Sequence, residues 1–244
     1  MAKKKSPAKK KRNDKLAKAL KLLRKIILIF FASTILVTIA FRFINPPLTW
    51  LMLQRAVERK FAGKEWKIQK DWKNMDEISL NLKRAAIAGE DAKFMEHWGF
   101  DVEAIEKAYQ KNQKGKKVRG GSTISQQTAK NVFLWPSRFA PFLWLRKGFE
   151  VYFTGLIELF WSKERILEVY LNVVETGDGV YGAEAASHKY FSKSASELSK
   201  SEASLLIAVL PNPLRWSPAK PTSYIYYKQG LILKNMKRLG KLNF

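Results

Sequence analysis

The longest apolar run in the chain covers residues 26–44 and reads IILIFFASTILVTIAFRFI. Its one charged residue, Arg42, stands near the end, where a long side chain can reach the membrane interface. At a rise of about 1.5 Å per residue, a helix over this run would be about 28 Å long, close to the thickness of a bilayer core. A buried core helix is the alternative. The run predicts a transmembrane helix, and no small-residue cleavage site follows it, which indicates an uncleaved signal anchor.

After this run, apolar positions recur mostly at helical spacing, which predicts a mainly α-helical domain over residues 45–244. Gly89 is the expected end of a helix that begins at Leu80, because glycine favours helix C-termini. Ser199 and Glu202 have the spacing of a capping box ahead of an apolar helix. The expected helices cover residues 48–61, 80–88, 203–210 and 223–239, with further helices after Asp101 and from Ser162.

Residues 131–144, NVFLWPSRFAPFLW, form a second unusual stretch. Its two prolines forbid a continuous helix, yet its aromatic and leucine side chains would form a large apolar patch if they were exposed. Such a patch is either packed as ordinary core or in contact with a membrane.

Charge changes the interpretation of the N-terminus. The chain carries a net charge of +24, and residues 1–25 contain twelve Lys or Arg against the single Asp14. A stretch so basic and so poor in apolar residues is expected to stay unordered at least as far as Asp14. Cations on the N-terminal side of the anchor predict that this end lies in the cytoplasm and the rest outside it. The predicted division is a basic tail at 1–25, an anchor at 26–44 and an extracytoplasmic domain at 45–244.

The candidate chemistry lies between residues 89 and 131. Glu90 and Asp91 follow the expected helix of residues 80–88, so a carboxylate at its end can be aimed into a cleft. Ser122 and Thr123 are helix-cap candidates, and Gln126, Gln127 and Lys130 follow within a turn of one another. A carboxylate opposite a cationic, amide-bearing face suits a reaction in which a base removes a proton while an anionic leaving group is held. The chain has no cysteine, which excludes disulfides and a cysteine nucleophile.

A third group, Arg146, Lys147 and Glu150, falls on one or two turns of a predicted helix. On spacing alone, a weak surface ion pair explains it as well as a binding site does. Together with Lys130, these residues could instead neutralise a pyrophosphate, with Glu150 orienting the cations or holding a divalent cation against it.

Five segments in this order resemble the motifs of the peptidoglycan glycosyltransferases, the family that includes monofunctional transglycosylases and the N-terminal module of class A penicillin-binding proteins. They are EDAKFMEHWG from Glu90, GGSTISQQTAKN from Gly120, RKGFE from Arg146, WSKERILEVYLN from Trp161 and GDGVYGAEAASHKYF from Gly177. The resemblance implies a lysozyme-like helical domain in which residues 131–144 belong to a small hydrophobic, membrane-associated lobe.

The resemblance also implies the reaction and its residues. Lipid II would be polymerised into glycan strands with inversion at the anomeric carbon and release of undecaprenyl pyrophosphate, with Glu90 as the base and Glu150 as the second catalytic carboxylate. His97 would pack and form hydrogen bonds. The residues implied in substrate binding are Gln127, Lys130, Arg138, Arg146, Lys147, Ser122 and Thr123.

No metal site is certain from the sequence: Mg²⁺ or another divalent cation at Glu150 is the candidate cofactor, and no organic cofactor is expected. The expected partners are lipid II, the growing glycan chain, the lipid bilayer and proteins of cell-wall synthesis or division, but not nucleic acid. The expected location is the outer, periplasmic side of the cytoplasmic (inner) membrane, with a single pass.

Two other classes of protein stay open: a lysozyme-like hydrolase, and a non-catalytic membrane protein whose basic surface binds anionic lipid or nucleic acid.

Overall fold

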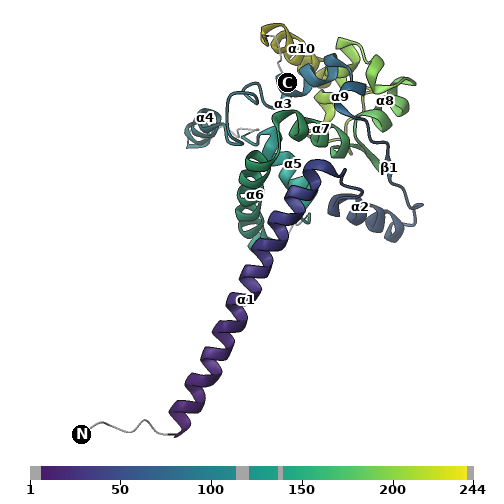
Figure 1. Ribbon diagram of the computed structural model, residues 1–244. Helices are drawn as coiled ribbons and strands as arrows, with labels where there is room; N and C mark the ends of the chain where they lie inside the picture. Colours follow the sequence, from purple (N-terminus) through teal and green to yellow (C-terminus); the bar gives the residue numbers. More distant parts are fainter. Residues whose placement is uncertain (1–6, 114–120, 137–139, 241–244) are drawn as a thin grey trace. The chain divides into compact units, whose positions relative to one another are not determined.

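The computed structural model of this 244-residue chain describes residues 7–113, 121–136 and 140–240. The chain divides into two compact units, Met1–Phe43 and Ile44–Phe244. Helices dominate both units (Figure 1). The predicted mainly α-helical class is therefore confirmed.

The first unit is a single long helix, α1 (Pro7–Phe43), drawn in purple in Figure 1. Its segment Lys15–Phe43 is long and apolar enough to cross a membrane, judged by length and composition. The expectation that the tail is unordered as far as Asp14 is wrong from Pro7 onward. Lysine and alanine are good helix formers, and a helix that is already nucleated extends at little cost, so the basic segment continues the apolar helix.

The second unit is built from shorter helices. Its α-helices are α2 (Trp50–Phe61), α3 (Leu80–Glu90), α4 (Val102–Gln113), α5 (Ile124–Phe133), α6 (Ala140–Phe160), α7 (Lys163–Val173), α8 (Ala183–Phe191), α9 (Lys200–Val209) and α10 (Ser223–Arg238), with one-turn 3₁₀ helices η1 (Met75–Glu77) and η2 (Ala195–Glu197). Helix α3 packs against α9 and α10, and α5 packs against α6 and α7. Fully buried side chains between these helices, such as Ile87, Ile124 and Tyr170, form the core.

A small sheet completes the second unit. Its strands β1 (Gln69–Lys70), β2 (Glu175–Gly177) and β3 (Val180–Tyr181) lie in the order β1-β3-β2. Strand β1 runs parallel to β3, and β2 runs antiparallel to it. Strands this short have no alternating pattern in the sequence, and the sheet was accordingly not predicted.

Capping side chains begin the helices where the sequence places them. Ser162 caps α7, and its hydroxyl accepts a hydrogen bond from the Arg165 amide at 3.1 Å. Ser199 and Glu202 form the expected capping box of α9. Asp101 accepts a hydrogen bond from the Ala104 amide at 2.9 Å, at the start of α4. These local signals set the helix starts because each one satisfies amide groups that the helix itself leaves unpaired.

Helix α3 does not end at the predicted residue. It continues through Gly89 and ends at Glu90, with Asp91 as its C-cap. Gly89 is needed here for space: a Cβ atom at this position would lie 2.7 Å from Cγ2 of Ile207 in α9 and 3.2 Å from Ile232 in α10. Glycine is therefore required at this position by the close packing of α9 and α10, and it does not mark the end of the helix.

The apolar stretch at 131–144 is divided between core and surface. Helix α5 ends within it, Leu134 is buried, and the ring of Phe133 stacks on Phe153 with centroids 4.5 Å apart. In the part that belongs to α6, residues 142–144 are exposed, with Trp144 at 85%. We call this exposed surface the α6 apolar patch, which consists of Phe142, Leu143, Trp144 and Leu145.

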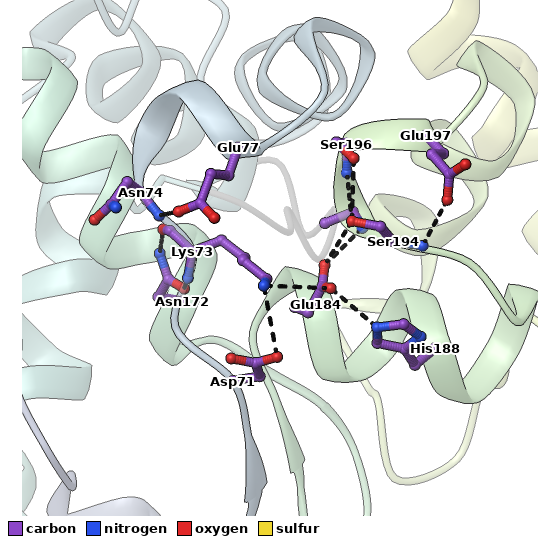
Figure 2. A network of polar contacts seen from close by, with 11 residues as sticks. Asp71, Lys73, Asn74, Glu77, Asn172, Glu184, His188, Ser194, Ser196 and Glu197 are labelled. Carbon is purple, nitrogen blue, oxygen red and sulfur yellow. Dashed lines mark hydrogen bonds and ion pairs between the residues drawn. The ribbon is translucent and has the colours of Figure 1, made fainter.

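Figure 2 shows a polar network that holds the segment leading into α3. Both polar atoms of the Asn172 amide bond to the backbone of Lys73 at 2.8 Å. The Lys73 ammonium lies 3.7 Å from the buried Glu184, which also accepts a hydrogen bond from the Ala195 amide at 2.6 Å. His188 contacts Glu184 at 2.9 Å. Glu184, in the last of the five motifs, thus helps to hold the segment that precedes α3.

Candidate active site

Glu90, the last residue of α3, is half-buried beside α5. One of its carboxylate oxygens, Oε2, accepts a hydrogen bond from Nε2 of Gln127 at 2.8 Å. Burial raises the pKa of Glu90, whereas the hydrogen bond from Gln127 and the charges of Lys228 and Lys130 lower it. Asp91 adds a small upward contribution. The net direction of the pKa change is upward, with burial as the main cause.

Asp91 faces away from this position. It is 7% exposed, its Oδ1 lies 2.9 Å from Nε2 of His97, and its Oδ2 accepts a hydrogen bond from the Ile124 amide at 3.0 Å. Ile124 is the first residue of α5, where a carboxylate is also favoured by the helix dipole. The two neighbouring carboxylates therefore have different surroundings. Glu90 lies beside Gln127, whereas Asp91 links the end of α3 to the start of α5 through its hydrogen bond with Ile124. The expected hydrogen-bonding role of His97 is confirmed.

The loop between α3 and α4 is fixed from several sides. Phe94 is fully buried, and the Lys163 ammonium lies 4.6 Å from the centre of its ring. Gly99 has a φ of +77°, and a Cβ atom on it would lie 2.7 Å from Thr154. Its carbonyl accepts a hydrogen bond from the Thr123 hydroxyl at 2.6 Å. Because this loop cannot shift freely, the end of α3 that carries Glu90 is held in place.

Helix α5 presents its polar side chains in two directions. Thr123 and Gln126 form a capping box and are buried, so Gln126 does not share a face with Gln127 and Lys130 as the spacing suggested. Gln127 and Lys130 are half-buried and line the same pocket. Ser122 is exposed just before the cap. The predicted substrate contacts of Ser122 and Thr123 stay predictions, and the hydroxyl of Thr123 is already occupied by cap and loop hydrogen bonds.

Lys130 lies within electrostatic reach of the group on α6. Burial lowers the pKa of Lys130; Arg146 and Lys147 lower it further, while Glu150 and Glu90 raise it. Glu150 is buried, and its Oε1 lies 2.5 Å from Nζ of Lys147. The structure therefore brings together the two halves of the predicted site, which are separated by more than a dozen residues in the sequence.

The pocket beside Gln127 and Lys130 has a volume of about 260 Å³. Two charged residues that line it, Arg55 of α2 and Glu175 of β2, were not predicted. Arg55 lies 120 positions from Glu175 in the sequence, and no local pattern indicates that they meet. The remaining lining residues are Leu51, Asn131, Leu134, Pro136, Arg146, Val174, Leu210 and Pro213.

Two predicted features have less support from geometry. Arg138 lies outside the described residues, so its contact with substrate stays a prediction. Among the residues that the structure describes, there is no group of three or more His, Asp or Glu side chains that could hold a metal ion. A divalent cation at Glu150 would have to take its other ligands from a bound substrate and water, as Mg²⁺ often does.

The comparisons with known proteins agree with this geometry. The family model described as Transglycosylase matches residues 58–237. The chain is similar to the protein named "Biosynthetic peptidoglycan transglycosylase" of Pseudomonas syringae pv. syringae, with 53% identity over 216 residues, which cover 88% of this chain and 90% of that protein. Its counterpart in Pseudomonas entomophila is 50% identical over 225 residues, or 92% of this chain and 94% of that protein.

Proposed function

The chain belongs to the transglycosylase family, and from that premise we propose that it polymerises lipid II into the glycan strands of peptidoglycan. In this reaction the 4-hydroxyl oxygen of one disaccharide forms a bond to the anomeric carbon of the growing chain. The bond from that carbon to the pyrophosphate oxygen breaks, and undecaprenyl pyrophosphate departs with the electron pair. The configuration at carbon inverts because attack and departure occur on opposite faces.

One observation carries the proposal: the Gln127 side chain bonds to Glu90 at 2.8 Å and also lines the pocket that Lys130 and Arg146 line. A carboxylate thus stands next to a compact cationic pocket. A hydrolase that acts on finished glycan needs the carboxylate but no cationic site for a leaving group. The joint arrangement suits transfer from a pyrophosphate-linked donor.

Glu90 takes the role of general base. It accepts the proton of the attacking hydroxyl as the new glycosidic bond forms, so its carboxylate must be ionised at the start of each cycle. Burial raises the pKa of Glu90, which makes its carboxylate a stronger base than an exposed glutamate. The hydrogen bond from Gln127 orients the carboxylate.

The cations hold the leaving group. Lys130 and Arg146 would bind the phosphate oxygens of the donor, and Lys147, which is paired with Glu150, would add positive charge nearby. The amide of Gln127, the hydroxyl of Ser122, and Arg138 are further proposed contacts of the substrate. The Thr123 hydroxyl would have to exchange its cap or loop hydrogen bond to become another.

Glu150 has two candidate roles in this proposal. It holds Lys147 at 2.5 Å and acts on Lys130 through its charge, so it can keep both cations in place. It could also hold a divalent cation such as Mg²⁺, which would neutralise charge on the pyrophosphate. Removal of metal by EDTA separates these roles: turnover is unchanged in the first case and is restored only by added Mg²⁺ in the second.

The membrane is part of the proposed function. We infer that α1 crosses the cytoplasmic membrane once, with the basic tail in the cytoplasm and the catalytic unit on the outer, periplasmic side. The α6 apolar patch would then rest in the bilayer, from which lipid II and the growing chain reach the site. Proteins of cell-wall synthesis or division are proposed partners on the same side.

Incubation of the detergent-solubilised protein with labelled lipid II tests the reaction, with products separated on a gel. We expect polymer from the wild type and a loss of turnover of about 10²–10⁴-fold in Glu90→Gln, as is typical for a general base. In Lys130→Ala, turnover should fall by about 10²–10³-fold because charge on the leaving group is no longer offset. Both variants must fold. Polymer at the wild-type rate from folded Glu90→Gln would exclude Glu90 as the base, and soluble fragments from purified peptidoglycan would indicate the hydrolase instead.

A further inference from the structure

Among the described residues that line the pocket beside Glu90, Arg55 is the cation that lies outside the five motifs. Arg55 belongs to α2, ahead of the first residue of the segment matched by the family model, residue 58. Arg55 lines the pocket together with Lys130 and Arg146. A helix that begins seven residues after the end of α1 therefore adds a positive charge to a pocket whose other described cations come from α5 and α6.

Arg55 is held firmly in this position. Its Nε donates to Oε1 of Glu175 at 3.1 Å, and its Nη2 lies 3.5 Å from Oε2 of the same carboxylate. Its Nη1 donates to Oε2 of Glu58 at 2.9 Å. The two carboxylates come from different directions, one from the sheet and one from the next turn of α2. Because these two carboxylates already fix the guanidinium, it loses little conformational freedom when it binds a ligand.

The Arg55 guanidinium has N–H groups that its two carboxylate partners do not use. Of its five N–H groups, the three contacts above use three, and no described residue accepts from the other two. The side chain is 19% exposed, so part of it reaches the pocket that it lines. Two N–H groups in a planar fork suit the oxygens of a phosphate group.

The charges in the pocket fit a particular ligand class. Among the described lining residues, Arg55, Lys130 and Arg146 carry positive charge and Glu175 is acidic, which leaves two net positive charges. A pyrophosphate diester has an ionised oxygen on each phosphorus, so the two charges match. The volume of about 260 Å³ leaves room for such a group.

We propose that Arg55 binds the pyrophosphate of the lipid-linked donor directly, as a third cation beside Lys130 and Arg146. The identity of the ligand rests on the proposed function, whereas the anion site itself rests on the pocket. Helix α2, which follows α1 in the sequence, is thereby part of the substrate site.

Another role for Arg55 has to be separated from this one. Burial raises the pKa of Glu175, so the loss of Arg55 alone would leave a buried carboxylate without its ion-pair partner and could disturb the pocket indirectly. The double variant Arg55→Gln with Glu175→Gln removes both charges and leaves two amides that can bond to each other. If Arg55 serves only to neutralise Glu175, this variant binds pyrophosphate as well as the wild type does.

Arg59, one turn further along α2, provides the control variant. Arg59 also forms an ion pair, with Asp178, and donates to the carbonyl of Glu65 at 3.1 Å, but it does not line the pocket. Arg59→Gln therefore removes an arginine and an ion pair from α2 without touching the proposed site.

The experiment measures the dissociation constant of inorganic pyrophosphate by titration calorimetry on the full-length protein in detergent, together with the KM and kcat for lipid II. We expect the dissociation constant and the KM to rise on the order of ten-fold to a hundred-fold in Arg55→Gln and in the double variant, since hydrogen bonds to charged groups have about this effect. Arg55→Lys should recover part of the affinity, and Arg59→Gln should match the wild type.

Three results would overturn the proposal: wild-type affinity in the double variant, an equal loss in Arg59→Gln, or no binding of pyrophosphate by the wild type. A wild type that binds pyrophosphate through Arg55 but forms no polymer from lipid II would leave the anion site in place and refute the proposed function. The two claims therefore fail separately.

Discussion

At the scale of single residues, the position of Glu90 decides the pH dependence of the reaction. Burial raises its pKa above the ordinary value of 4.5, so the base becomes protonated at a higher pH than an exposed glutamate would. We expect the rate of lipid II polymerisation to fall on the acid side with a midpoint above 4.5. A pH–rate profile checks this, and a profile that stays flat down to that value would contradict the role of Glu90 as base.

The same shift predicts an effect on stability. Because the folded protein binds the Glu90 proton more tightly than the unfolded chain does, Glu90 makes stability fall as the pH rises from 4.5 through the raised pKa. At neutral pH the ionised carboxylate is therefore unfavourable to folding. We expect Glu90→Gln to unfold at a higher temperature than the wild type at neutral pH, with the difference shrinking below pH 4.5. Thermal unfolding at both pH values tests this, and a lower unfolding temperature for the variant at neutral pH would refute it.

At the scale of elements, the packing of α3 against α9 and α10 places Glu90, the proposed base. Gly89→Ala would bring a methyl group within 2.7 Å of Ile207, and we expect a loss of about 1–3 kcal/mol in the free energy of unfolding, as is common for overpacked cores. Turnover should fall as well, since Glu90 is the next residue. Denaturant unfolding and the lipid II assay measure the two effects.

Gly155 provides the matched control. It also lies within a helix, α6, but a Cβ atom there would meet nothing within 4 Å. Gly155→Ala should be neutral or stabilising by up to about 1 kcal/mol, because alanine favours the helix. A loss of stability equal to that of Gly89→Ala would show that the close contact with α9 is not the cause.

The α6 apolar patch makes a separate prediction. Trp144 is 85% exposed and Leu145 is also exposed, so replacing both by serine should leave the free energy of unfolding in detergent nearly unchanged. In liposomes, however, each replacement removes apolar surface that the bilayer would otherwise cover, and we expect turnover to fall several-fold. Leu159→Ser, at an exposed position near the other end of α6, is the control. An equal fall in detergent and in liposomes would argue against contact between the patch and the membrane.

At the scale of the whole molecule, the proposed topology can be tested because the chain contains no cysteine. A single cysteine introduced at Ala8 or at the exposed Ala219 is then the unique target of a thiol reagent. In intact cells whose outer layers admit the reagent, a membrane-impermeant maleimide should label Ala219→Cys but label Ala8→Cys only after lysis. Labelling of both variants before lysis would contradict the proposed orientation.

The sequence by itself determined those features that depend on local interactions. The apolar run of residues 26–44 is visible because membrane-crossing length and composition are properties of a continuous segment. The caps at Ser162 and Ser199 are visible because a hydroxyl reaches amide groups only two or three residues away. Glu90, Gln127 and Lys130 were also found from their own segments and motifs, although the roles assigned to them stay predictions.

Only the tertiary structure decided which of these groups meet. Gly89 lies inside α3 because α9 and α10 leave no room for a side chain there, and neither helix is close in sequence. Asp91 is turned to the start of α5, and Arg55 meets Glu175 across 120 positions of chain. Such contacts have no local signal, because they depend on how distant helices pack to bury their apolar faces. The sequence therefore identifies the candidate reactive groups, and the packing determines the pocket beside which they lie.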